Sequence, residues 1–447
     1  MSYKTRVWFL LSVVVVGALL LSACAGPTPT PTTPPPPPAK PTEAPTPVPP
    51  TETPVAEKKQ LEIFSWWTTG GEAAGLLKLF ELYNQKFPDV EIINATVAGG
   101  AGFEAKPALK ARMLGGDPPD SFQVHMGHEL IDTWVTTGYM EPLDDLYKQE
   151  GWDKVFPPGV LEIVSYDGHY WSVPVNIHRS NVLWYNKKVF EANGWKPPET
   201  FDEFFALAEE MKAKGITPLA LGDVGIWAST HLFEVVLAGT MGAEKYKGLW
   251  TGETDWNGPE VRQALETMAK MLEYVNPDHS ALSWDQANDL VIQGKAGMTI
   301  MGDWVDADNL AKGFTDSGWA PPPGTKGIFI ALSDTFGLPK GAPHREQVIE
   351  WLRLVGSKQG QEAFNPLKGS ICARSDCDPN LFGPYLQSAM QDWAKDTIVP
   401  SLAHGAAASE SWVTMINDVM TAFVADRDVA KAQAGLAQAC KDAGVCK

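Results

Sequence analysis

Strand-like and helix-like patterns of apolar residues alternate along this chain, and the first pair of them is the clearest. An apolar run at residues 61–66 leads into a Thr-Thr-Gly-Gly turn at 68–71, and Glu72 opens a pattern with helical spacing. Open α/β sheets build a ligand crevice from such a strand, turn and helix start, at the carboxyl end of the strand. We therefore expect a ligand site near residues 61–72.

Two adjacent tryptophans, Trp66 and Trp67, close this strand-like run. At a crevice they are suited to stack on a flat apolar face such as a sugar ring, but they can equally fill the core. Alternation along a strand would bury one of them and expose the other. The run alone leaves both interpretations open.

The same alternation continues toward the carboxyl terminus and predicts an α/β fold with a mostly parallel sheet covered by helices on both faces. Thr200, followed three residues later by Glu203, predicts a capping box at the start of one helix. The expected strands are 90–97, 121–125, 171–176, 182–185, 216–221, 297–301, 328–332 and 335–338, and the expected helices are 72–87, 105–114, 129–137, 200–214, 285–293 and most of the chain after 345.

The start of the chain has the pattern of an export signal at residues 1–23, in which Lys4 and Arg6 precede an apolar stretch too short to span a membrane as a stable helix. The letters LSAC that end it resemble the lipobox of bacterial lipoproteins, which predicts an acyl chain on Cys24. An ordinary signal cleaved elsewhere is the alternative. Residues 24–59 are rich in Pro and Thr, which predicts an extended stalk behind the lipid anchor.

The composition of the remaining part, about 390 residues, is sufficient for two packed lobes. Loss of the export signal removes two basic residues, so the net charge falls from −18 to −20. This acidity argues against nucleic acid or anionic lipid as a partner.

Four cysteines follow Cys24, and an even count in an exported chain predicts two disulfides. Their short spacings favour the pairs Cys372–Cys377 and Cys440–Cys446. Neither pair has the spacing of a zinc site, and no histidine lies beside them at ligand spacing, so no metal is expected.

Several stretches, taken in order, resemble one family: the extracellular solute-binding proteins of bacterial ABC sugar importers, family 1, which includes maltose-binding protein. The resemblance rests on LEIFSWW, GGDPPDSFQVH, WSVPVNIHRSNVLWYNKKVFEANGWKPPETFDEF, QGKAGMTIMGDW and NPLKGS, which cover the whole globular part. Within the family the chain is most similar to the glucose or aldohexose binders, which share the WW pair, the QVH strand, LSD before FGLPKG, the PLKGS loop and a late SLAHGA.

The resemblance implies a two-lobed α/β fold of the periplasmic-binding-protein type (type II, like maltose-binding protein), with a ligand cleft between the lobes and a hinge. It places residues 60–178 with 303–355 in the first lobe and 179–302 with 356–447 in the second. It also implies an exported, lipid-anchored monomer at the outer face of the cell membrane that delivers its ligand to ABC permease subunits, without a cofactor and without catalysis.

The resemblance also supplies a set of ligand-binding residues, because a hexose needs aromatic faces for its ring and charged or amide groups for its hydroxyls. Arg179 belongs to the set although maltose-binding relatives carry a carboxylate at that position, on the first hinge crossing. The aromatic members are Trp66, Trp67, Trp284 and Trp304, and the polar members are Glu72, Gln123, His125, Arg179, Asp334, Lys368 and His404.

Some of these residues have simpler interpretations. Glu72 suits the positive end of a helix, Lys368 a solvated loop, and His404 a hydrogen-bonded core. Asp303 is expected to cap the helix that follows Gly302, and Trp227 to pack in the core. The glycines near residue 100 match a loose dinucleotide fingerprint, but they are expected to allow close backbone approach near the cleft.

Three function classes remain. The first, implied by the resemblance, is capture of an aldohexose, with glucose foremost and galactose or mannose as alternatives. The second is a secreted carbohydrate-active enzyme that uses Glu72 and Asp334 as its two carboxylates. The third is an adhesive lipoprotein without a small ligand.

Overall fold

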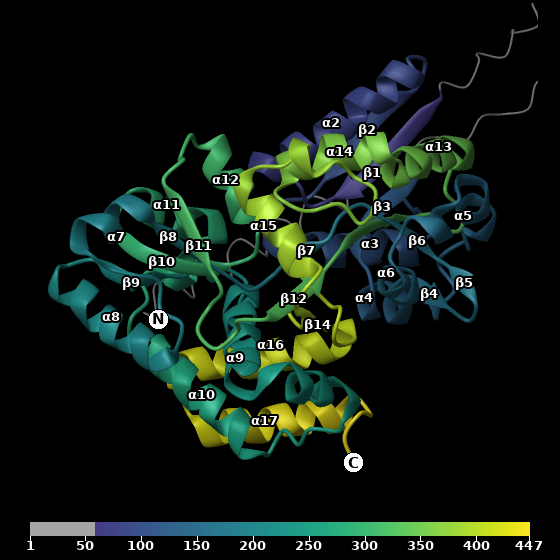
Figure 1. The fold of residues 1–447 in the computed structure, drawn as a ribbon. Helices are drawn as coiled ribbons and strands as arrows, with labels where there is room; N and C mark the ends of the chain where they lie inside the picture. The colour runs from purple at the N-terminus through teal and green to yellow at the C-terminus, as the bar shows by residue number, and fades with distance from the viewer. Residues whose placement is uncertain (1–58) are drawn as a thin grey trace, which may run out of the picture. The chain divides into compact units, whose positions relative to one another are not determined.

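The computed structural model describes residues 59–447, which belong to one compact unit (Figure 1). The predicted export signal, Cys24 and nearly all of the predicted stalk lie outside the described residues. Within the described part, no helix is long and apolar enough to cross a membrane.

The first sheet has the strand order β2-β1-β3-β13-β6. β1 pairs in parallel with β2 and β3, whereas β13 is antiparallel to both of its neighbours. β2, β1, β3 and β6 therefore run in one direction, as expected for a mostly parallel sheet, and β13, which arrives from far along the chain, runs against them. The strands are β1 Gln60–Ser65, β2 Glu91–Thr96, β3 Ser121–His125, β6 Ser172–Pro174 and β13 Asp334–Gly337.

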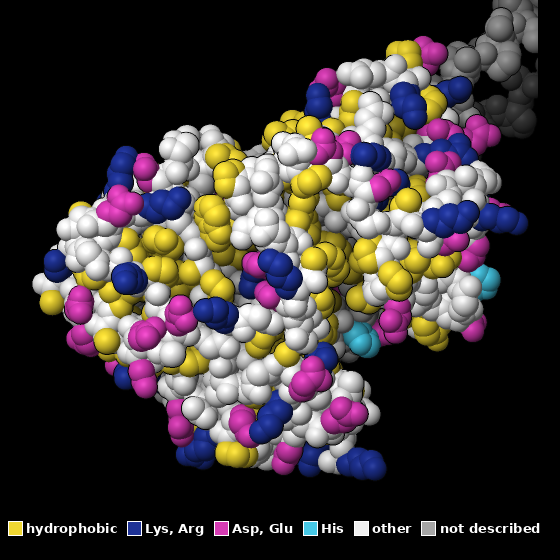
Figure 2. Space-filling view, in the orientation of Figure 1, with side chains coloured by type: hydrophobic (Ala, Val, Ile, Leu, Met, Phe, Trp, Pro, Cys, Tyr) yellow, Lys and Arg dark blue, Asp and Glu magenta, His cyan; other side chains and the backbone are white. Residues whose placement is uncertain are grey.

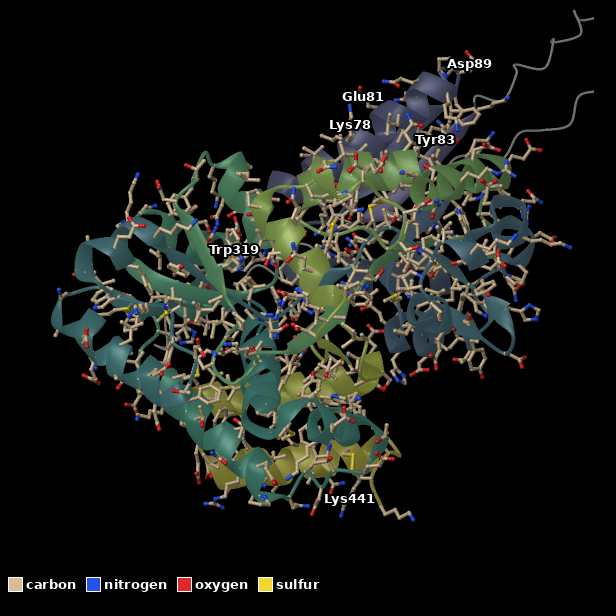
Figure 3. All side chains as sticks on the ribbon, viewed as in Figure 1. Lys78, Glu81, Tyr83, Asp89, Trp319 and Lys441 are labelled. Atoms are coloured by element: carbon tan, nitrogen blue, oxygen red, sulfur yellow. A yellow bond between two sulfur atoms is a disulfide. The ribbon has the colours of Figure 1, made fainter. Side chains whose placement is uncertain are left out.

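Helices pack around this sheet, and α2 lies against both α13 and α14. On α2 the side chains of Lys78 and Glu81 form a surface ion pair 2.8 Å long, while Tyr83 is buried (Figure 3). The helices are α2 Gly70–Lys86, α3 Ala105–Leu114, α4 His128–Leu130, α5 Asp144–Glu150, α6 Pro158–Ile163, α13 Arg345–Gly356 and α14 Lys358–Lys368, with a π-helical segment Ile131–Val135 and 3-10 turns Gly100–Gly102 and Trp152–Lys154.

The second sheet has the order β11-β8-β10-β9, and α8 and α11 pack on it. Thr200 and Glu203 form the predicted capping box at the start of α8. The strands are β8 Val182–Asn186, β9 Thr217–Ala220, β10 Ala296–Met301 and β11 Ser317–Ala320, and the helices are α7 Lys187–Asn193, α8 Phe201–Ala213, α9 Trp227–Thr251, α10 Pro259–Met271, α11 Trp284–Ile292 and α12 Trp304–Ala311, with a 3-10 turn His279–Ala281.

A third, three-stranded sheet, β14-β12-β7, connects the other two. β12 continues directly into β13 of the first sheet, and β7 follows β6 of the first sheet, so two chain crossings run side by side. Its strands are β7 His178–Arg179, β12 Ile328–Leu332 and β14 Thr397–Pro400. The remaining elements are the β4–β5 hairpin Ser165–Tyr166 and His169–Tyr170, the 3-10 turn Pro379–Leu381, and the helices α15 Pro384–Trp393, α16 Glu410–Asp426 and α17 Val429–Asp442.

The predicted lobe boundaries separate two pairs of elements that contact each other. β11 pairs with β8 in the second sheet, although residues 303–355 were assigned to the first lobe. α14 packs along α2, although residues 60–178 were assigned to the first lobe and residues 356–447 to the second. The resemblance to the family rests on motifs and contains no information on strand pairing, so it does not show which elements pack together at these boundaries.

Close packing joins α2, α12 and α14 where their ends meet. A Cβ atom at Gly71 would lie only 2.4 Å from both the Ala307 Cβ atom and the Leu367 carbonyl oxygen, so glycine is required there. Both cysteine pairs predicted from their spacing are joined, Cys372 to Cys377 and Cys440 to Cys446. On the face shown in Figure 2, acidic and basic side chains are mixed rather than gathered by sign.

The core of the first lobe depends on Trp351 of α13, which is fully buried and packs edge-on against Phe336 at a centroid distance of 5.3 Å. We expect Trp351→Ala to lower the free energy of unfolding by about 3–5 kcal/mol, because the substitution leaves a cavity that the sheet cannot fill. Leu77→Ala is the matched control: Leu77 is 55% exposed and should change stability by less than about 0.5 kcal/mol. Urea denaturation followed by circular dichroism measures both, and equal losses would contradict this account.

Candidate functional site

A small cavity lies where the carboxyl ends of β1 and β3 meet the amino-terminal ends of α2, α9, α11 and α12. The space left between its side chains is about 30 Å³. Its lining residues come from segments more than 300 positions apart: Trp66, Trp67, Glu72, Gly100, Ala101, His125, His178, Trp227, Trp284, Trp304, Leu332, Asp334, Lys368 and His404.

Nine of the eleven predicted ligand-binding residues line this cavity, and Gln123 and Arg179 do not. The sequence therefore indicated a set of residues that the fold brings together. Whether the set holds a ligand stays a prediction at this point.

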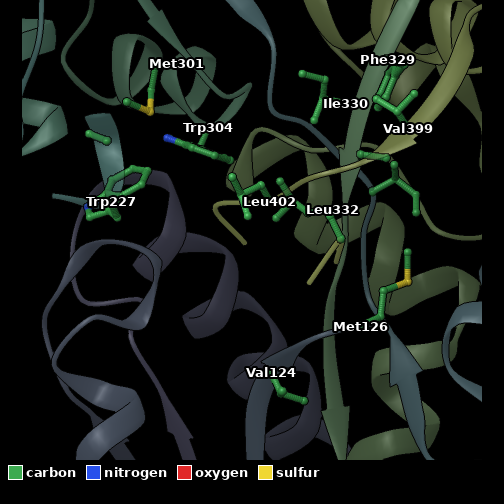
Figure 4. Close-up of a cluster of buried hydrophobic side chains, with 14 of the residues drawn as sticks. Val124, Met126, Trp227, Met301, Trp304, Phe329, Ile330, Leu332, Val399 and Leu402 are labelled. Atoms are coloured by element: carbon green, nitrogen blue, oxygen red, sulfur yellow. The ribbon is translucent and has the colours of Figure 1, made fainter. Parts of the chain in front are cut away.

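Trp304 is the central aromatic wall. Its ring lies 5.2 Å from the ring of His404 and 5.4 Å from that of His178, measured between centroids, and 6.5 Å from that of Trp284. Figure 4 shows Trp304 beside Trp227, whose ring is also 6.5 Å away. Most of these rings meet at steep angles, so they present edges and faces around a common centre rather than one stacked column.

Trp66 and Trp67 are both buried, at 6% and 1% exposure, and both line the cavity. The expectation that one would be exposed is wrong, because β1 ends at Ser65 and strand alternation does not extend to the pair. The ring of Trp67 also packs on Phe336 and Phe364, so it serves the core and the cavity wall together.

The ammonium group of Lys368 enters the cavity from the end of α14 and is 2% exposed. Its Nζ atom lies 3.1 Å from a carboxylate oxygen of Glu72 and 3.0 Å from Nε2 of His178. The same atom lies 5.4 Å from the ring centroid of Trp67. Lys368 is therefore not a solvated loop charge: ionic, hydrogen-bond and cation–π contacts offset its burial.

The carboxylate of Asp334 is held from both sides by amides. Nε2 of Gln123 donates to one oxygen at 2.7 Å, and Nδ2 of Asn176 donates to the other at 2.8 Å. Burial opposes ionisation, but His178, Lys368 and His125 together hold the pKa of Asp334 well below its usual range. Asp334 is thus an ionised acceptor at neutral pH.

His178 was not predicted from the sequence, yet its ring lies in the cavity wall. Its Nδ1 atom pairs with the carboxylate of Asp303, whose second oxygen accepts from the backbone N–H of Arg179 at 2.8 Å. Burial lowers the pKa of His178, but Asp303 outweighs it and the net pKa is raised. Asp303 therefore orients His178 rather than capping α12, because its side chain makes no cap hydrogen bond.

His125 is oriented in the same way by Glu129, which also pairs with Lys106. Nδ1 of His125 and Nζ of Lys106 each lie 2.7 Å from the same oxygen of Glu129. Burial raises the pKa of Glu129, but Lys106 and His125 outweigh it and lower the pKa to about 2. Nε2 of His125 therefore faces the cavity and lies 3.7 Å from a carboxylate oxygen of Asp334.

His404 lies in the turn after β14, and its Nδ1 atom is 2.8 Å from the hydroxyl oxygen of Ser401. Burial lowers the pKa of His404 well below its ordinary value, and the positive field of His125 adds to this. His404 is therefore neutral. His231 on α9 is a neighbour 5.9 Å away between ring centroids, and burial lowers its pKa to about 4.

The two remaining predicted residues have other roles. Gln123 is buried behind the wall, where it positions Asp334 and accepts from the backbone N–H of Trp66 at 3.2 Å. Arg179 does not reach the cavity: its guanidinium group contacts Asp392 at 2.6 Å and Asp396 at 3.5 Å. The assignment of Arg179 to the ligand-binding set finds no support in its position.

Arg179 points away from the cavity because side chains alternate between the two faces of a β-strand. His178 and Arg179 are adjacent in β7, so their side chains point to opposite faces. The predicted set contains Arg179, whereas it is His178, the residue before it, that lines the cavity. Alternation along VPVNIHR is the signal that could have identified His178.

Trp227, expected in the core, separates the cavity from a larger groove of about 780 Å³. Gly100, Ala101 and Trp227 line both spaces. A Cβ atom on Gly100 would lie 2.7 Å from Nε1 of Trp227, so glycine allows the loop to close against the indole, as the sequence predicted for glycines near the cleft. The groove continues outward along α16, past the half-exposed Phe103 and Asn417.

In the described residues, no group of three or more His, Cys, Asp or Glu side chains is arranged to hold a metal ion. The cavity therefore offers aromatic faces, two carboxylates, one ammonium group and three imidazoles. These are groups that bind a neutral polar ligand with an apolar ring face.

Comparison with known proteins places the chain. A family model described as bacterial extracellular solute-binding protein matches residues 67–362. An uncharacterised ABC transporter extracellular-binding protein of Pyrococcus horikoshii is 36% identical over 97% of this chain and 96% of its own length. A probable sugar-binding periplasmic protein of Brucella suis is 35% identical over 82% of this chain and 89% of its own.

A solved structure gives the same result for the fold. The bacterial solute receptor AcbH, described with a preference for β-D-galactopyranose, matches with a TM-score of 0.77 at 20% identity, over 86% of this chain and 99% of its own. This likeness confirms the two-lobed α/β fold. By its sequence match and its fold, the chain belongs to the bacterial extracellular solute-binding protein family.

Proposed function

We propose that this protein is the sugar-binding component of an ABC importer and that it captures a monosaccharide, glucose foremost, in the cavity around Trp304. The observation that carries the proposal is the composition of that cavity: tryptophans on several sides and ionised or hydrogen-bonding groups between them. Sugar rings offer C–H faces to indoles and hydroxyls to charged groups, and both kinds of partner are present.

The size of the cavity requires a conformational step. At about 30 Å³ it is far smaller than the roughly 300–1,000 Å³ of ordinary small-molecule sites, so its walls must separate before a sugar enters. The paired crossings at β6–β7 and β12–β13 are suited to be the hinge, since they join the first and third sheets side by side. A closed form around the sugar would then be the form delivered to a permease.

The division into lobes belongs to this proposal. We assign residues 60–177, β13 and α13–α14 to the first lobe, and the second and third sheets with α15–α17 to the second. Relative to the boundaries expected from the sequence, β11 moves to the second lobe and α14 to the first.

The choice of a hexose rests on matching donors and acceptors. Asp334 and Glu72 accept, and Lys368 donates, so adjacent hydroxyls of one pyranose can be paired on two sides. A sugar with a misplaced hydroxyl leaves one of these buried groups unpaired, and this rejects it. The resemblance of SLAHGA and PLKGS to the aldohexose binders favours glucose, with galactose and mannose as the alternatives.

The carbohydrate-active enzyme is less well supported. A glycosidase needs one carboxyl group that is protonated near neutral pH. Asp334 has a pKa well below its usual range, and Glu72 accepts from the ammonium group of Lys368. The pair thus lacks an evident acid, and we propose binding without catalysis.

Attachment to the outer face of the membrane through a lipid on Cys24, with residues 24–59 as the stalk, remains part of the proposal. The acidic charge supports a chain whose only tie to the membrane is its lipid. We propose that it acts as a monomer, with the ABC permease as its protein partner.

Isothermal titration calorimetry with glucose, galactose, mannose, xylose and maltose tests the proposal. We expect tight binding of glucose, weaker binding of its epimers and none of maltose. At a hundred times its dissociation constant, glucose should stabilise the protein by about 2.7 kcal/mol in thermal melts. Turnover of aryl glycosides would favour the enzyme, and no response to any sugar would favour the adhesive lipoprotein.

Removal of cavity walls should weaken the binding of glucose. We expect Trp67→Ala and Lys368→Ala each to raise the dissociation constant at least about tenfold, equivalent to ~1.4 kcal/mol, because one loses the ring face and the other the donor. Lys78→Ala is the control for the lysine, since Lys78 lies on the surface of α2 in an ion pair. Calorimetry on folded variants decides the matter: unchanged affinity in both would refute the assignment of the site.

The length of the sugar that the protein accepts should depend on Trp227, because this indole divides the cavity from the groove of about 780 Å³. We expect Trp227→Ala to join the two spaces and to give measurable binding of maltose, which the parent should not bind. Phe103→Ala is the control, since Phe103 lines the groove only. The same calorimetric panel reads both, and a variant that still excludes disaccharides would show that another group sets the limit.

A further inference from the structure

A buried carboxylate, that of Glu234, does not line the cavity but is linked through one residue to its wall. Glu234 on α9 is fully buried. Its side chain accepts from the hydroxyl of Ser180 at 2.6 Å and from the backbone N–H groups of Leu402 and Ala403 at 2.6 and 3.0 Å. The hydroxyl of Ser401 lies 3.0 Å from both carboxylate oxygens. Every neighbour of Glu234 in these contacts is a donor.

Ser401 links this carboxylate to the cavity. Its hydroxyl oxygen is 3.0 Å from Glu234 on one side and 2.8 Å from Nδ1 of His404 on the other. A hydroxyl has a single hydrogen, so it can donate to one of these neighbours only. Burial raises the pKa of Glu234 to about 7. Above that pH the carboxylate is ionised and is the stronger acceptor, so the hydrogen points to Glu234. Nδ1 of His404 must then carry the proton and donate to the hydroxyl oxygen.

The other nitrogen of His404 is left as an acceptor. His404 is neutral, as its lowered pKa requires, so protonation at Nδ1 leaves a lone pair on Nε2. Among the described residues, Nε2 has no hydrogen-bond partner, and the near neighbours of the ring are the rings of Trp304, Trp227, His125 and His231. The ring lines the cavity, so Nε2 is available to a ligand.

We propose that Glu234 is a positioning residue: through Ser401 it fixes His404 as the Nδ1–H tautomer, which makes Nε2 an acceptor for a ligand hydroxyl. The tautomer follows from the hydrogen bonds around Ser401 together with an ionised Glu234 and a neutral His404. Its use for a sugar hydroxyl rests on the proposed function.

The structure offers variants that separate this role from packing. In Glu234→Gln, the amide can donate to Ser401, whose hydroxyl is then free to donate to His404, so the tautomer should switch to Nε2–H. Ser401→Ala removes the link and should leave a mixture. Ser180→Ala is the matched control, because Ser180 also donates to Glu234 but does not contact His404 in the hydrogen-bond network.

The test is a long-range ¹H–¹⁵N correlation spectrum of the full chain with ¹⁵N-labelled histidine, assigned with His404→Asn. Spectra are recorded at pH 8, because burial raises the pKa of Glu234 to about 7 and the carboxylate is ionised above it. We expect a protonated Nδ1 and an unprotonated Nε2 in the parent and in Ser180→Ala. An Nε2–H tautomer or an imidazolium in the parent would overturn the proposal, as would an unchanged tautomer in both Ser401→Ala and Glu234→Gln.

Calorimetry on the same variants distinguishes the two claims. If His404 accepts from a sugar hydroxyl, Ser401→Ala should weaken glucose binding by about three- to tenfold, the worth of one hydrogen bond, and Ser180→Ala should not. If the parent shows the expected tautomer but binds no sugar, the proposed function fails while the positioning role stands. If Glu234→Gln does not fold, Ser401→Ala alone decides the outcome.

Discussion

The buried ammonium group of Lys368 is the constraint on which the site depends. A cation at 2% exposure must be paired and hydrogen-bonded, since an unpaired buried charge costs several kcal/mol. Its partners come from the start of α2 and from β7, and the ionised Asp334 of β13 stands close behind them. Lys368 thus ties the end of α14 to the start of α2 and to β7, three segments that are distant in sequence.

Carboxylates next to the cavity wall hold the histidine rings in position, as Lys368 holds the segments around it. Asp303 orients His178, Glu129 orients His125, and Glu234 acts on His404 through Ser401. Each imidazole therefore has its Nδ1 atom occupied, which leaves Nε2 on the cavity side. Nε2 of His178 is in turn paired with Lys368. Rings that are held in this way lose little freedom when a ligand binds, and preorganisation of this kind favours selective recognition.

The sequence predicted several elements well because their signals are local: Pro88 follows the end of α2, and Thr200 with Glu203 begins α8. The cavity set was reached through the ordered motifs of the family, since no periodicity links Trp67 to Lys368. What failed was non-local or depended on a side-chain direction. The reversed β13 and the pairing of β11 with β8 are fixed by strand pairing, which a single sequence does not show. The direction of Arg179 follows from the alternation along β7, and the loss of alternation at Trp66 and Trp67 from the end of β1 at Ser65.

The central claim is that a hexose binds between Trp67 and Trp304, against Lys368 and Asp334, once the walls separate. A crystal structure of the protein with glucose tests this most directly. The account predicts one pyranose stacked on an indole of this cavity, with hydroxyls paired to Lys368, Asp334 and Nε2 of His404. Glucose seated instead in the groove along α16, or on the surface with the cavity unchanged, would contradict it.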